Sequence, residues 1–208
     1  MAYPTVSAPY GLQPINSVDG KPYAGATRQL PIASTYNTAI FNGDIVRVAA
    51  GGTIQKSTVT VDATTAAANN TYGVFMGVQY TNAQGQTVQA QYYPGNAAAS
   101  SAIAYVVVDA NAAYKVAVTD GSGNVSSTTI GAIGVNLNVD QTNTGSTTTG
   151  DSGEGVTAPS ANAGNASTIP VKVVGVVPET AVNATNFREV IVVLTNPQMT
   201  RATGVDFA

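Results

Sequence analysis

The chain has 208 residues, a formal net charge of −3, and no histidine, cysteine or tryptophan. Only 9% of its residues are charged, against about 25% in an ordinary globular chain, so its surface must consist largely of amide, hydroxyl and small apolar groups. These features exclude histidine-based triads, disulfides and thiolate sites, and the scattered basic residues argue against binding to nucleic acid. The length is enough for one large β domain or two small ones.

Residues 1–40 form a distinct region in which prolines recur too closely for a helix or a central strand. Tyrosines punctuate the same stretch and offer large amphipathic contacts. A solvated terminus is one interpretation, but tyrosines and aliphatic residues interleaved with proline favour an extended N-terminal arm that docks on a partner. The predicted partner-binding residues are Tyr3, Pro4, Tyr10, Leu12, Ile15, Tyr23, Leu30 and Ile32.

The central region predicts short strands joined by tight turns. Residues 41–56 contain two apolar stretches on either side of Gly51-Gly52, and two glycines supply the positive φ angles of a tight hairpin turn. A strand over residues 72–80 would place Val74, Met76, Val78 and Tyr80 on one face, and the turn at 82–85 leads to a further strand over 87–93.

Two more strands are predicted on either side of a turn at 109–112. Residues 103–108 form a continuous apolar run, which predicts a strand buried on both faces. Residues 113–119 alternate through Tyr114, Val116 and Val118, as expected of a strand with one buried face.

The last third of the chain is more varied. Residues 128–139 suit either a short helix or an irregular segment, and residues 140–168 are low in complexity and predict a long polar loop. Residues 171–177 and 190–194 are rich in valine and predict two strands. We therefore expect a β domain over 41–195 with the polar loop at 140–168, followed by a C-terminal tail over 196–208.

No stretch predicts a helix of ordinary length, so the predicted fold class is all-β, with an antiparallel β-sandwich or a β-barrel-like domain. The N-terminal sequence lacks the basic and apolar segments of a signal peptide. No apolar run approaches the roughly 20 residues of a membrane-spanning helix, so no membrane partner is expected.

The sequence predicts no catalytic, cofactor or metal site, and the protein is not expected to be an enzyme. A Ser-x-x-Lys spacing and a phosphate-binding loop are both missing. Residues 151–154 hold two carboxylates that could bind a cation, but without the ligand spacing of a calcium loop. Acidic residues mostly fall in predicted turns, where they are expected to cap backbone amides rather than to pair: Asp44, Asp62, Asp109, Asp120, Asp140, Asp151, Glu154, Glu179 and Glu189.

Aromatic residues offer one more candidate surface. Tyr92-Tyr93 and the other tyrosines suit either a platform on which carbohydrate stacks or, as we favour, cross-strand pairs and interface anchors.

Several short motifs occur in a recognisable order along the chain: Ser7-Ala-Pro-Tyr-Gly-Leu-Gln-Pro-Ile, Leu30-Pro-Ile-Ala-Ser, Ile40-Phe-Asn-Gly-Asp-Ile-Val, Tyr72-Gly-Val-Phe-Met-Gly-Val, Gln91-Tyr-Tyr-Pro-Gly, Ala104-Tyr-Val-Val-Val-Asp, Thr147-Thr-Thr-Gly-Asp-Ser and Val171-Lys-Val-Val-Gly-Val-Val. This series resembles small virion structural proteins of tailed phages, especially phages of aquatic bacteria, and is similar in style to capsid decoration proteins. The resemblance implies a capsid decoration (cement) protein of the bacteriophage virion, often a homotrimer, bound outside the major capsid lattice. It carries over no functional residues, because such proteins act through surfaces.

The expected function is therefore protein–protein interaction on the capsid exterior, where the protein, made in the host cytoplasm, stabilises the DNA-filled head. The expected partners are the major capsid protein and further copies of the chain, with no cofactor. Two alternatives stay open. One is another virion component such as a tail, fibre or connector protein, and the other is a carbohydrate-binding β-sandwich.

Overall fold

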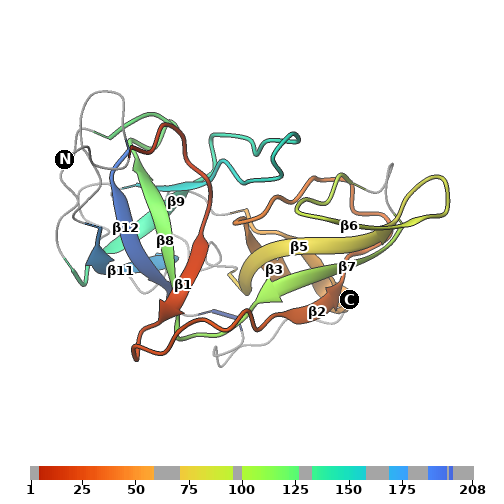
Figure 1. Ribbon diagram of the computed structural model, residues 1–208, viewed down its shortest axis with the longest axis horizontal. Helices are drawn as coiled ribbons and strands as arrows, with labels where there is room; N and C mark the ends of the chain where they lie inside the picture. The colour runs from red at the N-terminus through yellow and green to blue at the C-terminus, as the bar shows by residue number, and fades with distance from the viewer. Residues whose placement is uncertain are drawn as a thin grey trace.

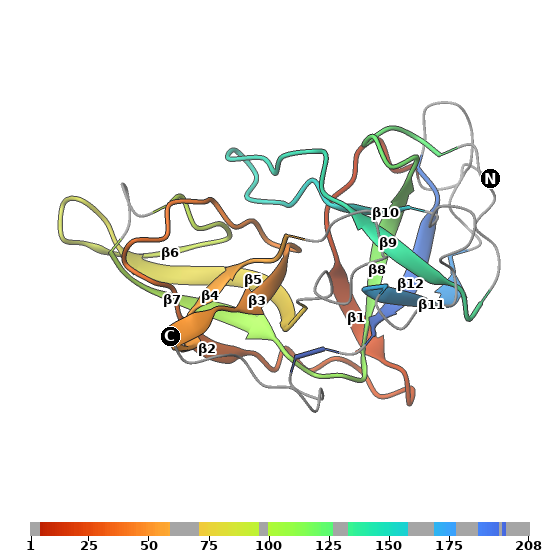
Figure 2. The same ribbon diagram turned by 180° about the vertical axis from the view of Figure 1, so that it is seen from behind.

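The computed structural model describes residues 5–58, 71–95, 100–126, 133–157, 169–177, 187–195 and 197–198. Within these ranges the chain forms strands β1 to β12 and one short 3₁₀ turn, Ala50–Gly52, with no α-helix (Figure 1). The prediction of an all-β fold is confirmed. The strands divide between a closed barrel and a second sheet, which lie side by side in both views (Figures 1 and 2).

The barrel is a ring of five strands. It closes because β12 pairs with both β11 and β8. β10 pairs in parallel with the end of β8, and β1 pairs antiparallel with its beginning, so β1 and β10 share one edge of that strand. The strands of the ring are β8 (Ala112–Thr119), β9 (Asn136–Asp140), β10 (Gly155–Thr157), β11 (Val171–Val176) and β12 (Glu189–Leu194), and β1 (Gln13–Ser17) is attached to β8 outside the ring.

The second sheet is antiparallel and has the order β2-β7-β5-β3-β4, with β6 paired to the far end of β5. Its hairpins follow the predicted turns, at Gly51-Gly52 between β3 and β4 and at residues 82–86 between β5 and β6. The strands are β2 (Arg28–Pro31), β3 (Ile45–Val48), β4 (Ile54–Lys56), β5 (Gly73–Thr81), β6 (Thr87–Ala90) and β7 (Ser100–Val107).

The burial of β7 and β8 reverses the sequence-based expectation. In β7, Ala102, Ala104 and Val106 are buried, whereas Ile103 is 38% exposed. The prediction that 103–108 is buried on both faces therefore fails at Ile103, on the open part of the sheet, and holds at Val106 and Val107, which are buried in the two different cores. β8 is buried almost throughout, since it lies between β12 and the β1–β10 edge in the barrel wall.

The prediction of an arm over 1–40, separate from the β domain, needs correction for its described part. This segment is extended, but β1 belongs to the barrel and β2 to the second sheet. Pro14 is tolerated because β1 pairs with β8 next to a register shift, and Pro31 because β2 is an edge strand. The segment thus links the two sheets.

Three expectations for the C-terminal third also change. Residues 136–139 of the ambiguous 128–139 segment belong to β9, which ends at Asp140, and not to a helix. The predicted polar loop 140–168 contains a buried strand, β10, while residues 158–168 lie outside the described residues. In the predicted tail 196–208, the Gln198 amide N–H donates to the Thr71 carbonyl at 2.7 Å, so Gln198 is still hydrogen-bonded to the β domain.

Two apolar clusters fill the molecule. One occupies the barrel and extends to Ile45, Val74 and Val107 of the second sheet, so the two parts share a core. The other packs under the second sheet around Phe75 and Tyr93. Among the described residues, no helix is long and apolar enough to cross a bilayer.

Candidate functional site

Three chain segments from different parts of the sequence cross where the barrel meets the second sheet. The Gly11 amide donates to the Glu154 carbonyl at 2.9 Å, and the Leu12 amide donates to the Gly43 carbonyl at 2.9 Å. The crossing depends on glycine, because a Cβ at Gly11 would lie 2.6 Å from the Cβ of Ser152. Gly11 and Gly43 also have φ angles of +78° and +95°, which other residues rarely adopt.

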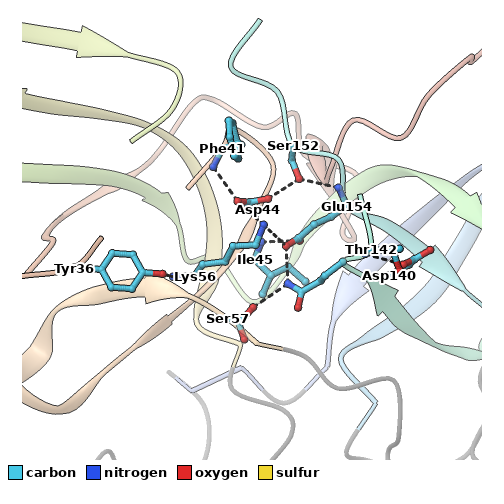
Figure 3. Close-up of polar contacts among 11 residues, drawn as sticks. Tyr36, Phe41, Asp44, Ile45, Lys56, Ser57, Asp140, Thr142, Ser152 and Glu154 are labelled. Carbon is cyan, nitrogen blue, oxygen red and sulfur yellow. Dashed lines mark hydrogen bonds and ion pairs between the residues drawn. The ribbon is translucent and has the colours of Figure 1, made fainter. Parts of the chain in front are cut away.

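A buried polar network, which we call the joint cluster, lies beside this crossing. It consists of Asp44, Lys56, Gln141, Ser152 and Glu154 (Figure 3). Asp44 and Lys56 come from the second sheet, at the start of β3 and the end of β4. The other three come from the connection between β9 and β10, so the cluster joins the two parts of the molecule.

Lys56 lies between two carboxylates. Its Nζ is 2.9 Å from Oδ2 of Asp44 and 3.2 Å from Oε1 of Glu154. Both acidic side chains are completely buried, whereas the Lys56 side chain is 20% exposed. Burying two carboxylates requires compensation by charge and by hydrogen bonds, and the lysine supplies the charge.

Asp44 is held by two donors besides Lys56. The Phe41 amide donates to Oδ2 at 2.9 Å, and the Ser152 hydroxyl donates to Oδ1 at 2.6 Å. The Glu154 amide in turn donates to the Ser152 hydroxyl at 2.9 Å. Each oxygen of the Asp44 carboxylate therefore has a fixed partner.

Glu154 is bonded in a similar way. The Ile45 amide donates to Oε2 at 3.1 Å, and Nε2 of Gln141 donates to Oε1 at 2.6 Å. Gln141 Nε2 also donates to the Ser57 carbonyl at 2.9 Å. The Glu154 carboxylate is thereby committed to internal partners, which does not suit the cation site considered for residues 151–154.

Burial and the charge of Asp44 raise the pKa of Glu154 to about 7, against the opposing effects of Lys56 and the two hydrogen bonds. Burial therefore favours the neutral acid form of this side chain more than in an exposed glutamate. Burial by itself lowers the pKa of Lys56, but the attraction of Glu154 and Asp44 is larger, and the net pKa is raised. The joint cluster thus has the components for internal proton transfer between an amine and a carboxyl group.

A cavity of about 400 Å³ lies on the outer side of Lys56. Tyr36, Arg47, Gln55 and Gln141 contribute to its lining. The hydroxyl of Tyr36 accepts a hydrogen bond from the Lys56 amide at 2.9 Å, which fixes the end of β4. The cavity gives the lysine, but neither buried carboxylate, contact with solvent.

A second polar group lies in a groove of about 680 Å³ beside the N-terminal segment. The Tyr10 hydroxyl donates to Oε1 of Glu189, and Lys115 Nζ lies 2.9 Å from the same oxygen and 5.6 Å from the centre of the Tyr10 ring. Burial, with help from Glu189, raises the pKa of Tyr10, so the phenol keeps its proton. This arrangement anchors the N-terminal segment to β8 and β12.

The predicted partner-binding residues do not form one surface. Leu12 and Ile32 are buried in the two cores, and Tyr10 is engaged with Glu189. Tyr23 and Leu30 are partly buried and pack against the cores. Ile15 is 38% exposed and stays available to a partner. Tyr3 and Pro4 lie outside the described residues.

The turn interpretation of the acidic residues holds for some and fails for others. Asp109 accepts the Asn111 amide at 2.9 Å, and Asp120 accepts the Ser122 amide at 2.7 Å, as expected of turns. Asp44 also caps a turn, but it meets Glu154 around Lys56, a pairing that the sequence analysis did not favour. Asp62 and Glu179 lie outside the described residues.

The joint cluster carries only a weak signal in the sequence. Asp44 stands directly before a buried strand, and Lys56 ends the next one, so a charged pair near one hairpin could have been inferred. Glu154 could not, because its contact with the Ile45 amide spans 109 positions of sequence.

The tyrosine pair has a structural role. Tyr93 is buried and stacks on Tyr36 with ring centres 6.4 Å apart, and Tyr92 stacks on Phe41 at 5.5 Å. These two rings thus pack against other aromatic rings of the same chain, whereas the favoured interpretation was cross-strand pairs and interface anchors. Across the described residues, no group of three or more acidic side chains is placed to hold a metal ion.

Comparison with known proteins gave no match to a protein-family model, to a curated protein or to a solved structure.

Proposed function

We propose that the protein is a capsid decoration (cement) protein of a tailed phage, which binds the outer surface of the major capsid lattice and stabilises the DNA-filled head. One observation carries the proposal: a chain with few charges also turns several of them inward. Asp44, Asp140, Glu154 and Glu189 are all buried, so four of the 11 acidic side chains are withdrawn from the surface.

A surface of this kind suits permanent contact with other subunits. Charged groups must lose their hydration in an interface, and they are depleted at the centres of known interfaces. A soluble domain that stays alone usually keeps more charge for colloidal stability. We therefore attribute the low charge to permanent contact with other subunits, namely the major capsid protein and further copies of this chain.

The open face of the second sheet is a suitable contact surface. Cross-strand pairs place Gln29 beside Tyr105, and Gln89 and Ile103 on either side of Gln79. Gln29, Gln89 and Ile103 are exposed, and the Tyr105 hydroxyl donates to the Gln79 amide oxygen at 3.2 Å. Amides, an aromatic ring and an aliphatic side chain without charge resemble the composition of protein interfaces.

A decoration protein would act at the contacts between capsid subunits. Packaged DNA pushes outward, so capsid subunits tend to separate. A protein that binds across a joint only while the joint is closed stabilises the closed lattice by mass action. Made in the host cytoplasm, the protein would act on the virion exterior as a homotrimer, the assembly that the resemblance to decoration proteins implies.

The proposal is tested by adding the purified protein to phage heads that lack it and imaging them by cryo-electron microscopy. We expect new density on the outer surface of the head, with the open face of the second sheet against a neighbouring subunit. The variant Ile103→Asp should bind more weakly, whereas the control Val18→Asp, an exposed residue outside this face, should bind normally. Density confined to the tail or the portal would reject the proposal in favour of another virion component.

A second candidate function is carbohydrate binding in the groove beside the N-terminal segment. Its lining includes the hydroxyl or amide groups of Ser7, Asn143, Thr144 and Ser146, near the Tyr10 ring. Such groups suit the hydroxyl-rich surface of a sugar. Binding of the protein to host-surface glycans, abolished by Asn143→Ala, would favour this role.

A further inference from the structure

The joint cluster brings an amine and a carboxylate together where water is largely excluded. Lys56 Nζ lies 2.9 Å from Oδ2 of Asp44, and the Asp44 side chain is completely buried. Reactive groups held at this separation no longer need to meet by diffusion, and such positioning accelerates reactions strongly. Glu154 stands 3.2 Å from the same nitrogen.

We propose that Lys56 and Asp44 join covalently through a side-chain amide (isopeptide) bond, with Glu154 carrying the protons. The bond would form within the folded chain without an external reagent. This inference does not depend on the capsid role, since it follows from the joint cluster alone.

The reaction is a condensation that releases one water molecule. Glu154 takes one proton from the Lys56 ammonium and passes it to Asp44, and the free amine attacks the carboxyl carbon of the neutral acid. In the resulting intermediate, Glu154 takes a second proton from the nitrogen and gives it to the departing hydroxyl. The C–O bond breaks, one oxygen of Asp44 leaves as water, and Glu154 returns to its starting state.

The surroundings of Asp44 favour it as the acceptor. The Ser152 hydroxyl and the Phe41 amide donate to its two oxygens at 2.6 and 2.9 Å. Fixed donors of this kind stabilise the negative charge that develops on oxygen during attack at a carboxyl carbon. Both donors are already in place in the folded chain.

The surroundings of Glu154 favour it as the proton carrier. Burial raises its pKa to about 7, which is close to the value at which a side chain transfers protons most effectively near neutral pH. Lys56 begins as an ammonium group, since its net pKa is raised, and therefore needs a nearby acceptor before it can attack. Burial favours the neutral form of both groups and so assists the transfer.

The bond would lock the β3–β4 hairpin at its open end. Asp44 precedes β3 and Lys56 ends β4, so the amide would close the hairpin opposite its Gly51-Gly52 turn. A covalent link across a loop restricts the unfolded chain and stabilises the folded one. The hairpin would then resist heat, denaturant and pulling forces that separate unlinked strands.

The test is the intact mass of the purified full-length protein, followed by digestion and fragment sequencing. We expect the main species to be lighter than the sequence by one water molecule, and one branched peptide to contain both Lys56 and Asp44. An intact mass equal to that of the sequence after prolonged incubation at neutral pH would overturn the proposal. A branched peptide that joins Lys56 to Glu154 would overturn the choice of acceptor.

Variants separate this bond from other losses of water. Asp-Gly sequences, which occur at residues 19–20 and 120–121, also lose water when they cyclise. Lys56→Arg should therefore restore the full mass, and Glu154→Gln should slow or abolish the loss while circular dichroism confirms that the variant is folded. The control Lys115→Arg makes the same substitution at an equally close but more exposed ion pair, Lys115 with Glu189 at 2.9 Å, and this variant should still lose water. Water loss that persists in Lys56→Arg would contradict the proposal.

Discussion

At the scale of single residues, Asp140 shows how a buried carboxylate is kept ionised. Its side chain is 1% exposed, and burial alone would raise its pKa. The Thr119 hydroxyl at 2.5 Å and the Thr142 and Gly123 amides at 3.0 and 2.9 Å have the larger combined effect, and they hold the pKa of Asp140 below its usual value. The carboxylate thereby ties the end of β9 to the turn after β8.

Asp140→Asn should lower the free energy of unfolding by about 1–3 kcal/mol near pH 7, because hydrogen bonds to a charged group are lost. The native pKa is depressed, so this contribution is present above the pKa of the unfolded chain and disappears as pH falls through the native value. The difference in free energy of unfolding between wild type and variant should therefore become smaller below about pH 4. Urea unfolding at several pH values measures this difference. A difference that does not change with pH would contradict a lowered pKa of Asp140 in the folded protein.

Gly11 provides a second prediction at this scale. Gly11→Ala places a Cβ 2.6 Å from Ser152 and 2.8 Å from Gly43, at a φ of +78°. Gly20→Ala is the matched control, because φ is +84° but no atom lies within 4 Å of the new Cβ. We expect a loss of about 1 kcal/mol for the control from its backbone conformation, and a further loss of at least about 2 kcal/mol at Gly11 from the overlap. Thermal unfolding measures the stability of both variants. Equal losses of stability in Gly11→Ala and Gly20→Ala would show that the segments around Gly11, Gly43 and Ser152 do not cross closely.

At the scale of elements, β1 is the strand whose role differs most from expectation. It pairs with β8, and the adjoining Leu12 is completely buried in the barrel core. Leu12→Ala should therefore lower the free energy of unfolding by about 2–5 kcal/mol. Ile15→Ala, at a position that is 38% exposed, should change it by less than about 1 kcal/mol. Denaturant unfolding measures the stability of both variants. A Leu12→Ala protein as stable as wild type would indicate that this segment is a separate arm after all.

Local patterns explain which elements were predictable from the sequence. The hairpin turn at Gly51-Gly52 and the valine-rich β11 and β12 depend on neighbouring residues, and each was predicted correctly. β1 and β2 were missed, because prolines argue against central strands but are tolerated where a strand pairs on one side only.

Long-range contacts explain what was not predictable. β10 has three residues in a segment of low complexity, and only its pairing with β8 and β9 makes it a strand. In the joint cluster, Ser152 and Asp44 are 108 positions apart. No local pattern reveals such a contact, although the scarcity of charge made each acidic residue worth attention.

At the scale of the whole molecule, a surface this poor in charge predicts self-association. We expect a trimer, as the resemblance to decoration proteins implies, held by contacts in which few charges need to be desolvated. Light scattering with sedimentation at micromolar concentrations measures the mass. A monomer both in solution and on the particle would contradict this expectation.

The central claim is that the protein reinforces a DNA-filled head, and DNA release on heating tests it most directly. Particles with and without the protein are heated in steps while the escaped DNA is measured, and host adsorption is measured on the same samples. We expect particles without the protein to assemble and adsorb normally but to release DNA at a lower temperature, and we expect added protein to restore the higher temperature. Unchanged DNA retention together with lost adsorption would contradict it.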